Sequence, residues 1–451
     1  MKRNTFILIV VSLLAFAGNM WADTDKLPAA DGWTKITSVP TSTDIANNYY
    51  VFVDATRDLM LGIGKGVHQD TKWYSLGVYY RSSVSPTTKD INQMVWTLEA
   101  QNDGFAMRNL ESPVRLFMTE WNAAWKFDTN DIFNVPNDGW TKVKFTLDDG
   151  KFTLQNGYYP SSGYIGPWDD VVEDGAECAG NKTGSSVGKF HIYAISRTQF
   201  KQNLLDNASS SNPVDLTPWY VTNPTFDGNS ITGWTDEGSG NNFNYDKTGC
   251  EIWHRSNFKL YQNVTIPNGK YKVSVQATGS TSGTVYGTSG ATTKEASATV
   301  ANQDNYQNSI LAMIRTRDLG RITTDEITVS NGSLTIGFKD GTNNQWDVFD
   351  NFKLYCTGVD LSAYEEQLAD LVSDCNDFID SDVVPTACEN AISSAITTYN
   401  QSYETAKEYS TAIVALTNVL DTYRNDTELQ NAYAAYKTMR TNGQGLENTD
   451  T

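Results

Sequence analysis

One acidic side chain stands inside a segment that otherwise has the pattern of a buried strand. The run NNQWDVFDNFKLYC (343–356) alternates like a strand, and Asp350 and Asn351 interrupt its apolar and aromatic positions. A buried carboxylate without a partner is costly in free energy. Asp350 must therefore be hydrated, hydrogen-bonded or bound to a cation, and the residues alone leave these three alternatives open.

Two aromatic clusters in the same part of the chain could bind sugars. A pyranose ring needs a flat apolar face to stack on and polar groups that hold its hydroxyls. Trp253, His254 and Arg255 form one such cluster, and Trp346 ends a second one, the run NNQW. Successive residues of a strand point to opposite faces, so the three residues of the first cluster cannot all line one pocket. Each tryptophan is either a sugar platform or a packing side chain.

The sequence supplies few residues for a familiar catalytic site. The motifs G-x-S-x-G and H-E-x-x-H, the phosphate-binding loop and the dinucleotide fingerprint do not occur. Histidine is present only at His68, His191 and His254, which supplies a Ser-His-Asp arrangement poorly. A carboxylate pair of the glycosidase kind stays open among 53 acidic residues. The sequence leaves catalysis undecided, but it favours a protein without catalytic activity, because each region resembles an accessory module.

Charge and the N-terminal segment restrict the partners and the compartment. The net charge of −19 repels nucleic acid and anionic membranes, and it suits neutral ligands or cations. A basic start (MKR), an apolar run (6–17) and small residues before Asp23 have the order of a secretory signal peptide, which we assign to residues 1–22. The apolar run is too short to span a bilayer. We expect a secreted, periplasmic or cell-surface protein without membrane insertion.

The chain has five cysteines, at positions 178, 250, 356, 375 and 388. An exported compartment permits disulfides, but an odd count leaves at least one thiol unpaired. Cys375 with Cys388 and Cys250 with Cys356 are the pairings to test. No C-x-x-C occurs, so the sequence gives no support to a zinc or thioredoxin-like site.

Residues 32–200 carry a repeated β pattern. The segment WTLEAQNDGFAMRN (96–109) resembles VKFTLDDGKFTLQN (143–156), since each has an alternating strand, a turn ending in Asp-Gly and a second strand. Related strands open the region at 49–62 and close it at 190–196, so a four-strand unit recurs three times. The region resembles a β-trefoil of the ricin-lectin type, although alternating strands with Asp-Gly turns also occur in other β domains.

This resemblance implies sugar sites at tryptophans that follow the second strand of each repeat. Trp73, Trp125 and Trp168 occupy these places, with Asp169 directly after Trp168. Lectins of this type hold an aromatic residue and an Asp in the corresponding pocket. The alternative is equivalent packing of the three tryptophans at one end of the barrel.

Residues 217–358 hold alternating strand segments separated by turns such as Pro267-Asn268-Gly269. Four motifs occur in the order found in galactose-binding-like jelly-roll modules, a family that includes many carbohydrate-binding modules. They are NPTFD (223–227), GW (233–234), YQNVTIPNGKY (261–271) and FDNFKL (349–354). The region therefore resembles such a module, of a kind carried by exported glycan-handling proteins of gut bacteria.

The same resemblance offers a role for Asp350. In jelly rolls of this family the Asp of the last strand lies beside the turn of the first strand, where calcium commonly binds. Asp227 and Asp350 match these positions, and a hard cation prefers several such oxygens. A structural Ca²⁺ ion is thus the implied cofactor. The alternative is that Asp350 and Asn351 hydrogen-bond the backbone of the first strand without a metal.

Residues 359–441 change to helical spacing. Apolar residues recur at this spacing from 361 to 378, from 391 to 403 and from 412 to 423. Pro385-Thr386 fits a helix start and Asn425-Asp426 a helix stop, and a fourth helix is expected from Thr427 to Met439. The region resembles the FIVAR-type spacers of large surface proteins. The tail (442–451) is expected to be disordered.

These observations predict a mainly β, multidomain protein. Its expected parts are a β-trefoil-like lectin domain (32–200), a β-sandwich jelly roll (217–358) and a C-terminal α-helical bundle (359–441). The predicted function is non-catalytic binding of a neutral polysaccharide or glycan through aromatic platforms. Two alternatives stay open: a surface adhesin or scaffold that binds other surface proteins, and the accessory portion of a polysaccharide-degrading enzyme.

Overall fold

The structure, a computed structural model, describes most of the chain between residues 27 and 441. The described residues are 27, 31–56, 59–67, 73–80, 91–110, 116–118, 123–126, 141–157, 160–161, 163–167, 176–226, 230–239, 243–247, 249–279, 283–297, 309, 313, 319–340, 346–380, 384–426, 428–429, 431–432, 434–435, 438–439 and 441. Some strand residues, including 73–80 and 123–126, are described by their backbone alone.

Several predicted features lie outside the described residues. They are the signal peptide (1–22), the tail (442–451) and the site candidates Asp227, Trp168 and Asp169. The fourth helix expected from Thr427 to Met439 falls where the description is interrupted.

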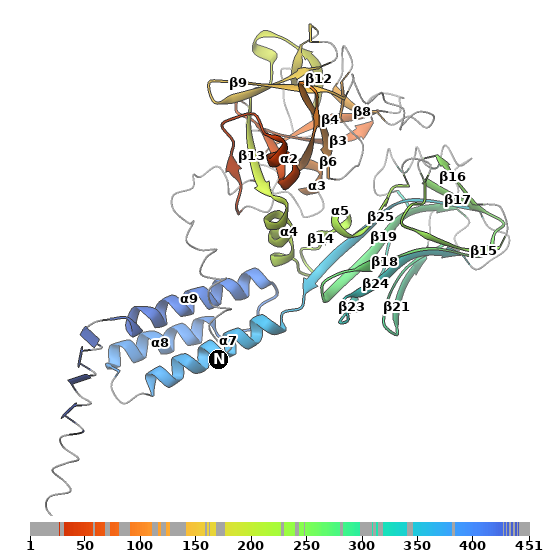
Figure 1. Ribbon diagram of the computed structural model, residues 1–451. Helices are drawn as coiled ribbons and strands as arrows, with labels where there is room; N and C mark the ends of the chain where they lie inside the picture. The colour runs from red at the N-terminus through yellow and green to blue at the C-terminus, as the bar shows by residue number, and fades with distance from the viewer. Residues whose placement is uncertain are drawn as a thin grey trace, which may run out of the picture.

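The described chain is mainly β, with several antiparallel sheets and a few C-terminal helices, as the sequence predicts. Figure 1 shows the N-terminal strands gathered in one body and two further sheets beside it. The helices α7, α8 and α9 lie next to one another at the other side of the molecule (Figure 1).

The described strands of the N-terminal body form one sheet of 13 strands. The strand order is β1-β13-β2-β5-β6-β9-β10-β11-β12-β4-β8-β7, with β3 paired to β2 and β4. Because β13 pairs with both β2 and β10, the strands β13, β2, β5, β6, β9 and β10 form a closed ring. The elements are β1 Thr34–Lys35, α2 Ser42–Asn47, β2 Asn48–Asp54, β3 Leu59–Val67, β4 Trp73–Tyr80, α3 Ile91–Met94, β5 Trp96–Gln101, β6 Gly104–Asn109, β7 Phe117–Met118, β8 Ala123–Lys126, β9 Val143–Asp148, β10 Lys151–Asn156, β11 Tyr164–Pro167, β12 Ala176–Lys182, η1 Gly184–Ser186 and β13 Phe190–Ser196.

The repeated hairpins predicted from the sequence are confirmed. β5 pairs with β6 and β9 pairs with β10, each in an antiparallel register. Both pairs place the first residue of the repeat opposite its final Asn: Trp96 opposite Asn109, and Val143 opposite Asn156. The inward side chains of these and neighbouring strands form one core, which includes Tyr50, Phe52, Trp96, Phe105, Phe152 and Phe190.

The middle of the chain forms two facing sheets. The β25 sheet has the order β16-β17-β25-β19-β22, with β14 added to β25 and β23 to β19, and the β24 sheet has the order β15-β18-β24-β20-β21. Between them, Phe338 of β24 stacks on Phe349 of β25 with ring centroids 4.4 Å apart. The elements are α4 Arg197–Asp206, β14 Val214–Asp215, α5 Thr217–Tyr220, β15 Thr235–Ser239, β16 Phe243–Lys247, β17 Gly249–Trp253, β18 Ser256–Thr265, β19 Gly269–Gly279, β20 Thr284–Ser289, β21 Thr292–Ser297, β22 Arg321–Thr323, β23 Ile327–Val329, β24 Ser333–Asp340 and β25 Trp346–Val359.

β25 contains one residue more than β19 where the two strands pair. Ser274 lies opposite Lys353 and Gln276 lies opposite Asp350, so two steps along β19 face three along β25. Asn351 takes a φ of +56° at this point, a conformation that Asn tolerates better than most residues. The polar interruption in the sequence is therefore a β-bulge, which we call the β25 bulge.

The β25 bulge keeps two aromatic side chains in the same core. Residues an odd number of positions apart on a regular strand face opposite sides of a sheet. Phe349 and Phe352 are three apart, yet both are fully buried, and both contact the ring of Phe226 at centroid distances of 5.9 and 6.0 Å. The extra residue shifts the alternation so that both rings enter the core.

Three C-terminal helices form among the described residues of the region of helical spacing, and the start of α8 and the end of α9 lie where the sequence predicts. They are α7 Ser362–Ile379, α8 Thr386–Tyr399 and α9 Ala406–Arg424. Pro385 is the N-cap of α8 and Asn425 the C-cap of α9. The apolar faces share a core that includes Leu368 and Leu416. None of the helices in the described part of the chain is long and apolar enough to cross a membrane.

All five cysteines are free thiols, so neither disulfide pairing suggested by the sequence is present. Cys250 lies opposite Phe349, and Cys356 belongs to the same strand β25 as Phe349. Positions 349 and 356 are separated by roughly 20 Å of extended strand. A disulfide needs Cα atoms within about 7 Å, which excludes the pair Cys250–Cys356.

We predict that native protein exposes one reactive thiol and that unfolded, unreduced protein exposes five. Cys388 is half-buried and the other four cysteines are buried. Burial, together with the nearby Asp350 carboxylate, raises the pKa of the Cys250 thiol well above its usual value and suppresses the reactive thiolate. Titration with Ellman's reagent before and after denaturation measures both numbers. Recovery of only three thiols after unfolding would reveal a disulfide and contradict this arrangement.

Candidate functional site

Trp253 presents an aromatic ring to solvent at the end of β17. Cys250 and Ile252 of this strand are buried in the core, so Glu251 and Trp253 face outward. Trp253 is 55% exposed. Among the described residues, the exposed large hydrophobic side chains are Val39, Trp253 and Met439, so Trp253 is the aromatic member of this set. Because Trp253 belongs to a paired strand, its backbone position and the side of the sheet that it faces are fixed.

A second tryptophan lies directly across the strand pair from Trp253. The register of β17 and β25 places Trp346 opposite Trp253, and opposed residues of antiparallel strands share one face of the sheet. Trp346 is half-buried, and its indole Nε1 donates a hydrogen bond of 2.6 Å to Glu251 Oε1. The two tryptophans predicted from separate sequence clusters are thus neighbours on the outer face of the β25 sheet.

Glu251 and Asn244 are polar residues of this surface that the sequence did not single out. The amide Nδ2 of Asn244 donates to Glu251 Oε2 at 3.5 Å, while Glu251 Oε1 accepts from Trp346. The alternation of β17 places Glu251 on the same face as Trp253, which was the available signal. The sequence did not indicate that β17 pairs with β25, and this pairing brings Trp346 to the Glu251 carboxylate.

The two residues after Trp253 differ in their exposure and in their contacts. His254 is exposed, takes a φ of +51°, and its ring lies 5.2 Å from the Trp253 ring. Arg255 is buried at 8% exposure, and its Nη2 donates to Asp236 Oδ2 at 2.8 Å. The Arg255 guanidinium also lies over the Phe243 ring at 5.2 Å. Arg255, a predicted sugar contact, therefore links β15 of the β24 sheet to β16 of the β25 sheet.

Asp350 is buried and hydrogen-bonded. Its Oδ1 accepts the backbone N–H of Asn351 at 2.6 Å, and the Asn351 side chain donates to Gln276 Oε1 at 2.9 Å. Arg321 Nη1 donates to the Asn351 carbonyl at 2.6 Å. Polar groups of Asp350 and Asn351 in the β25 bulge are therefore hydrogen-bonded within a network that includes Gln276 and Arg321.

The turn that was expected to face Asp350 is in contact with the β25 bulge. Phe352 N donates to the Pro224 carbonyl at 2.8 Å, and the Asn223 carbonyl accepts from Trp234 Nε1 at 3.1 Å. Carboxylate and peptide oxygens are the donors that Ca²⁺ prefers, so the donor types here fit that ion. Within the described ranges, no three His, Cys, Asp or Glu side chains cluster as metal ligands. Calcium binding would thus depend on Asp350, on peptide carbonyls and on Asp227, which lies outside those ranges.

The outer face of the β24 sheet carries tyrosines, but cations and the sheet cover them. Lys259 Nζ lies 4.9 Å from the Tyr261 ring centroid, and Lys339 Nζ lies 5.6 Å from that of Tyr286. Tyr286 is only 4% exposed and lies against the Cα of Gly337. A sugar ring cannot stack on an aromatic face that is already covered, so this sheet offers a poorer surface than Trp253.

The structure places two of the N-terminal candidates on paired strands. Trp73 of β4 lies opposite Lys126 of β8, and Trp125 of β8 lies opposite Tyr74 of β4. Their backbone positions are therefore adjacent in one ladder. Trp168 and Asp169 lie outside the described residues, as does Asp227.

Comparison with known proteins gives structural neighbours only. No protein-family model matches the chain, and no curated protein matches it. Similar structures include the carbohydrate-binding module TmCBM61 in complex with β-1,4-galactotriose (18% identity, 30% of this chain and 97% of that chain, TM-score 0.23). They also include the Rhizoctonia solani agglutinin (10% identity, 36% and 98%, TM-score 0.25) and a carbohydrate-binding module of Cellvibrio mixtus lichenase 5A in complex with cellotriose (15% identity, 29% and 92%, TM-score 0.18).

These structural neighbours are carbohydrate-binding modules and a lectin. Their TM-scores are low, so the similarity supports no conclusion about what this chain binds.

We predict that Trp346→Phe lowers the free energy of unfolding by about 1 kcal/mol, because Glu251 loses a charge-assisted hydrogen bond that is partly screened by solvent. Denaturant unfolding followed by circular dichroism measures this. Tyr261→Phe is the matched control, since it removes a hydroxyl that donates to Glu237 at an exposed site. If both variants lose the same free energy of unfolding, the hydrogen bond from Trp346 to Glu251 stabilises the fold no more than an exposed one, which would contradict the prediction.

Proposed function

We propose that this chain is an exported, non-catalytic carbohydrate-binding protein that binds neutral glycans through the outer face of the β25 sheet. The observation that carries the proposal is the exposed indole of Trp253, held on a strand beside Trp346. Exposing an indole forgoes the free energy of burying it, and a flat ring with polar neighbours is what a pyranose needs.

The polar groups around Trp253 suit hydroxyl groups. His254 lies beside the Trp253 indole, and the linked side chains of Asn244, Glu251 and Trp346 add amide, carboxylate and indole N–H groups to the same face of the sheet. The net charge of −19 disfavours acidic polysaccharides. The ligand class that fits both conditions is a neutral glycan.

The proposal includes a modular organisation. We assign residues 32–200 to a β-trefoil-like lectin domain, which the closed ring of strands and the repeated hairpins support. Residues 217–358 would be a galactose-binding-like jelly roll and residues 359–441 a FIVAR-like helical spacer. Residues 1–22 would direct export to the periplasm, the cell surface or the medium, where other surface proteins are further partners.

We predict that Trp253→Ala weakens retention on a bound glycan by about tenfold or more, because loss of a central aromatic contact removes about 1.4 kcal/mol or more of binding free energy. The melting temperature should stay unchanged, since the ring is 55% exposed. Affinity electrophoresis in polysaccharide gels and differential scanning fluorimetry measure the two quantities.

Trp234→Ala is the control for a packing tryptophan. Trp234 is 7% exposed, and its indole Nε1 donates to the Thr222 carbonyl at 2.9 Å. This variant should melt at a clearly lower temperature. If Trp253→Ala melts as early as Trp234→Ala and keeps its glycan retention, Trp253 is a packing residue and the proposal fails.

A glycan array probed with the secreted chain tests the ligand class. Binding to neutral glycans that Trp253→Ala abolishes supports the proposal. Release of reducing ends from a polysaccharide panel would instead support a catalytic role, and binding to protein spots alone would support an adhesin.

We further propose that Asp350, with Asp227, holds a structural Ca²⁺ ion. The buried carboxylate and the adjoining peptide oxygens have the donor types for such an ion. The ion would supply a fixed positive charge that joins the first turn to the last strand.

We predict that EDTA lowers the melting temperature of the wild-type chain and that added Ca²⁺ restores it, because a ligand of the native state stabilises it. Asp350→Asn keeps an oxygen acceptor but loses the charge, so EDTA should change its melting temperature little. No effect of EDTA on the wild type would remove calcium from this account.

A further inference from the structure

A buried ion pair joins β25 to the segment that precedes the facing sheets. Lys353 Nζ lies 3.0 Å from Asp215 Oδ2, and the two side chains are 6% and 2% exposed. The partners are 138 positions apart in the sequence. Charges this deeply buried persist only when they are paired and hydrogen-bonded, so the position of Asp215 is tightly specified.

Further hydrogen bonds hold the same segment on β25. The backbone N–H and the hydroxyl of Thr217 both donate to Asp215 Oδ1, and the Thr217 hydroxyl accepts from Leu354 N at 2.9 Å. Leu216 N donates to the Leu354 carbonyl at 2.8 Å. β14 also pairs with β25, with Val214 opposite Cys356. Both oxygens of the buried carboxylate are therefore occupied.

The same segment is packed against α4 and against β2 of the N-terminal body. The Trp219 ring lies 6.1 Å from that of Phe200 in α4 and 6.2 Å from that of Tyr49 in β2. Lys201 Nζ lies 4.1 Å from the Tyr220 ring centroid. Side chains of the N-terminal body and of the facing sheets belong to one continuous apolar core, which contains Tyr49 and Val214.

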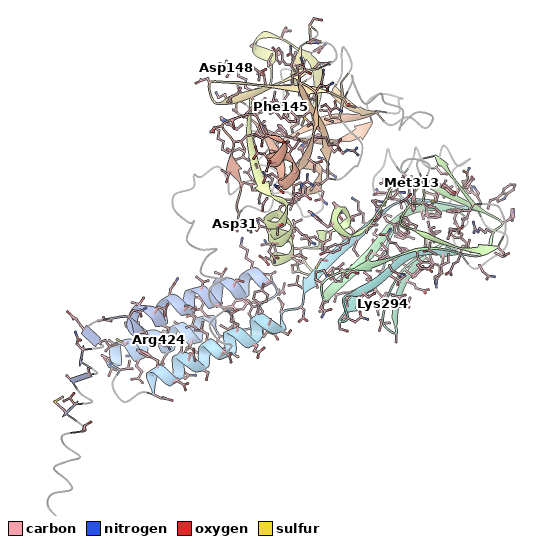
Figure 2. All side chains as sticks on the ribbon, viewed as in Figure 1. Asp31, Phe145, Asp148, Lys294, Met313 and Arg424 are labelled. Carbon is pink, nitrogen blue, oxygen red and sulfur yellow. The ribbon has the colours of Figure 1, made fainter. Side chains whose placement is uncertain are left out.

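The helices reach the same region. Lys407 of α9 forms an ion pair of 2.7 Å with Asp31, and Asn92 Nδ2 of α3 donates to the Asp215 carbonyl at 3.4 Å. Figure 1 shows α4, α5 and β14 where the N-terminal body, the facing sheets and the helices come together. Asp31 is labelled near this junction in Figure 2.

We infer that residues 207–221, which we call the lock, are not a flexible linker. Asp215, Thr217 and Trp219 of this segment, together with Lys353 of β25, hold the N-terminal body and the facing sheets together as one rigid unit. Interfaces between domains of one chain usually permit relative motion. Here a paired strand, a buried ion pair and a shared core remove that freedom. The inference is independent of glycan binding.

The lock is tested in the full chain by the distance between two spin labels. Asp148→Cys in the N-terminal body and Ala291→Cys in the β20–β21 turn are exposed positions, and Cys388→Ser removes the half-buried native thiol. Figure 2 shows Asp148 on the N-terminal body, away from the junction. Double electron–electron resonance should give one narrow distance distribution for this parent protein.

Lys353→Met and Thr217→Val are the test variants. The first leaves the Asp215 charge buried without its partner, and the second removes the hydroxyl that bridges Asp215 and Leu354. Both should broaden the distance distribution while circular dichroism stays as in the parent. Lys339→Met is the control, because Lys339 pairs with Glu295 at an exposed site, and its distribution should stay narrow.

The distance distributions of the parent protein and of the variants decide whether the lock exists. If Lys353→Met fails to fold, Thr217→Val decides, since it keeps the ion pair and nearly the same side-chain volume. A broad distribution in the parent protein overturns the inference, as does a narrow one in every folded variant. Loss of glycan binding in Trp253→Ala does not bear on these results, so the lock and the proposed function can fail separately.

Discussion

The β25 bulge is the constraint on which the rest of the facing sheets depends. It shifts the alternation of the strand by one residue, which lets Phe349 and Phe352 enter the same core. The same shift places Trp346 and Lys353 on one outer face, although an odd number of positions separates them. A regular strand would turn one of the two inward: either Trp346 would lose its place beside Trp253, or the lysine of the lock would enter the apolar core.

The proposed glycan-binding surface and the lock share one strand. Trp253 and Trp346 lie where β17 pairs with β25, and Asp215 adds β14 to a later part of the same strand. A ligand surface on paired strands loses little backbone conformational entropy on binding, because the strands are already ordered. Fixing the N-terminal body to β25 extends this preorganisation, so that a second surface on that body would meet a long glycan at a set distance and angle.

Local features of this fold were predictable from the sequence, and long-range ones were not. Alternation with Asp-Gly turns predicted the hairpins, and Pro385-Thr386 and Asn425-Asp426 predicted the start of α8 and the end of α9, because these features depend on neighbours in sequence. The role of Arg255 and the partners of Trp346 depend on which strands pair, which no local pattern contains. Asp350 and Asn351 were recognised as unusual, but the β25 bulge became evident only with β19 beside it. No sequence pattern around Asp215 indicated that it would pair with Lys353 at the centre of the lock.

The most direct test of the central claim is an ¹H–¹⁵N spectrum of the chain with ¹⁵N-labelled tryptophan, titrated with neutral oligosaccharides. The indole signal that disappears in Trp253→Phe identifies Trp253, and that of buried Trp234 is the internal reference. Our account predicts a saturable shift of the Trp253 signal, with the Trp346 signal following and Trp234 unchanged. Saturable binding that leaves the Trp253 signal in place, or a full neutral-glycan panel without any shift, would contradict it.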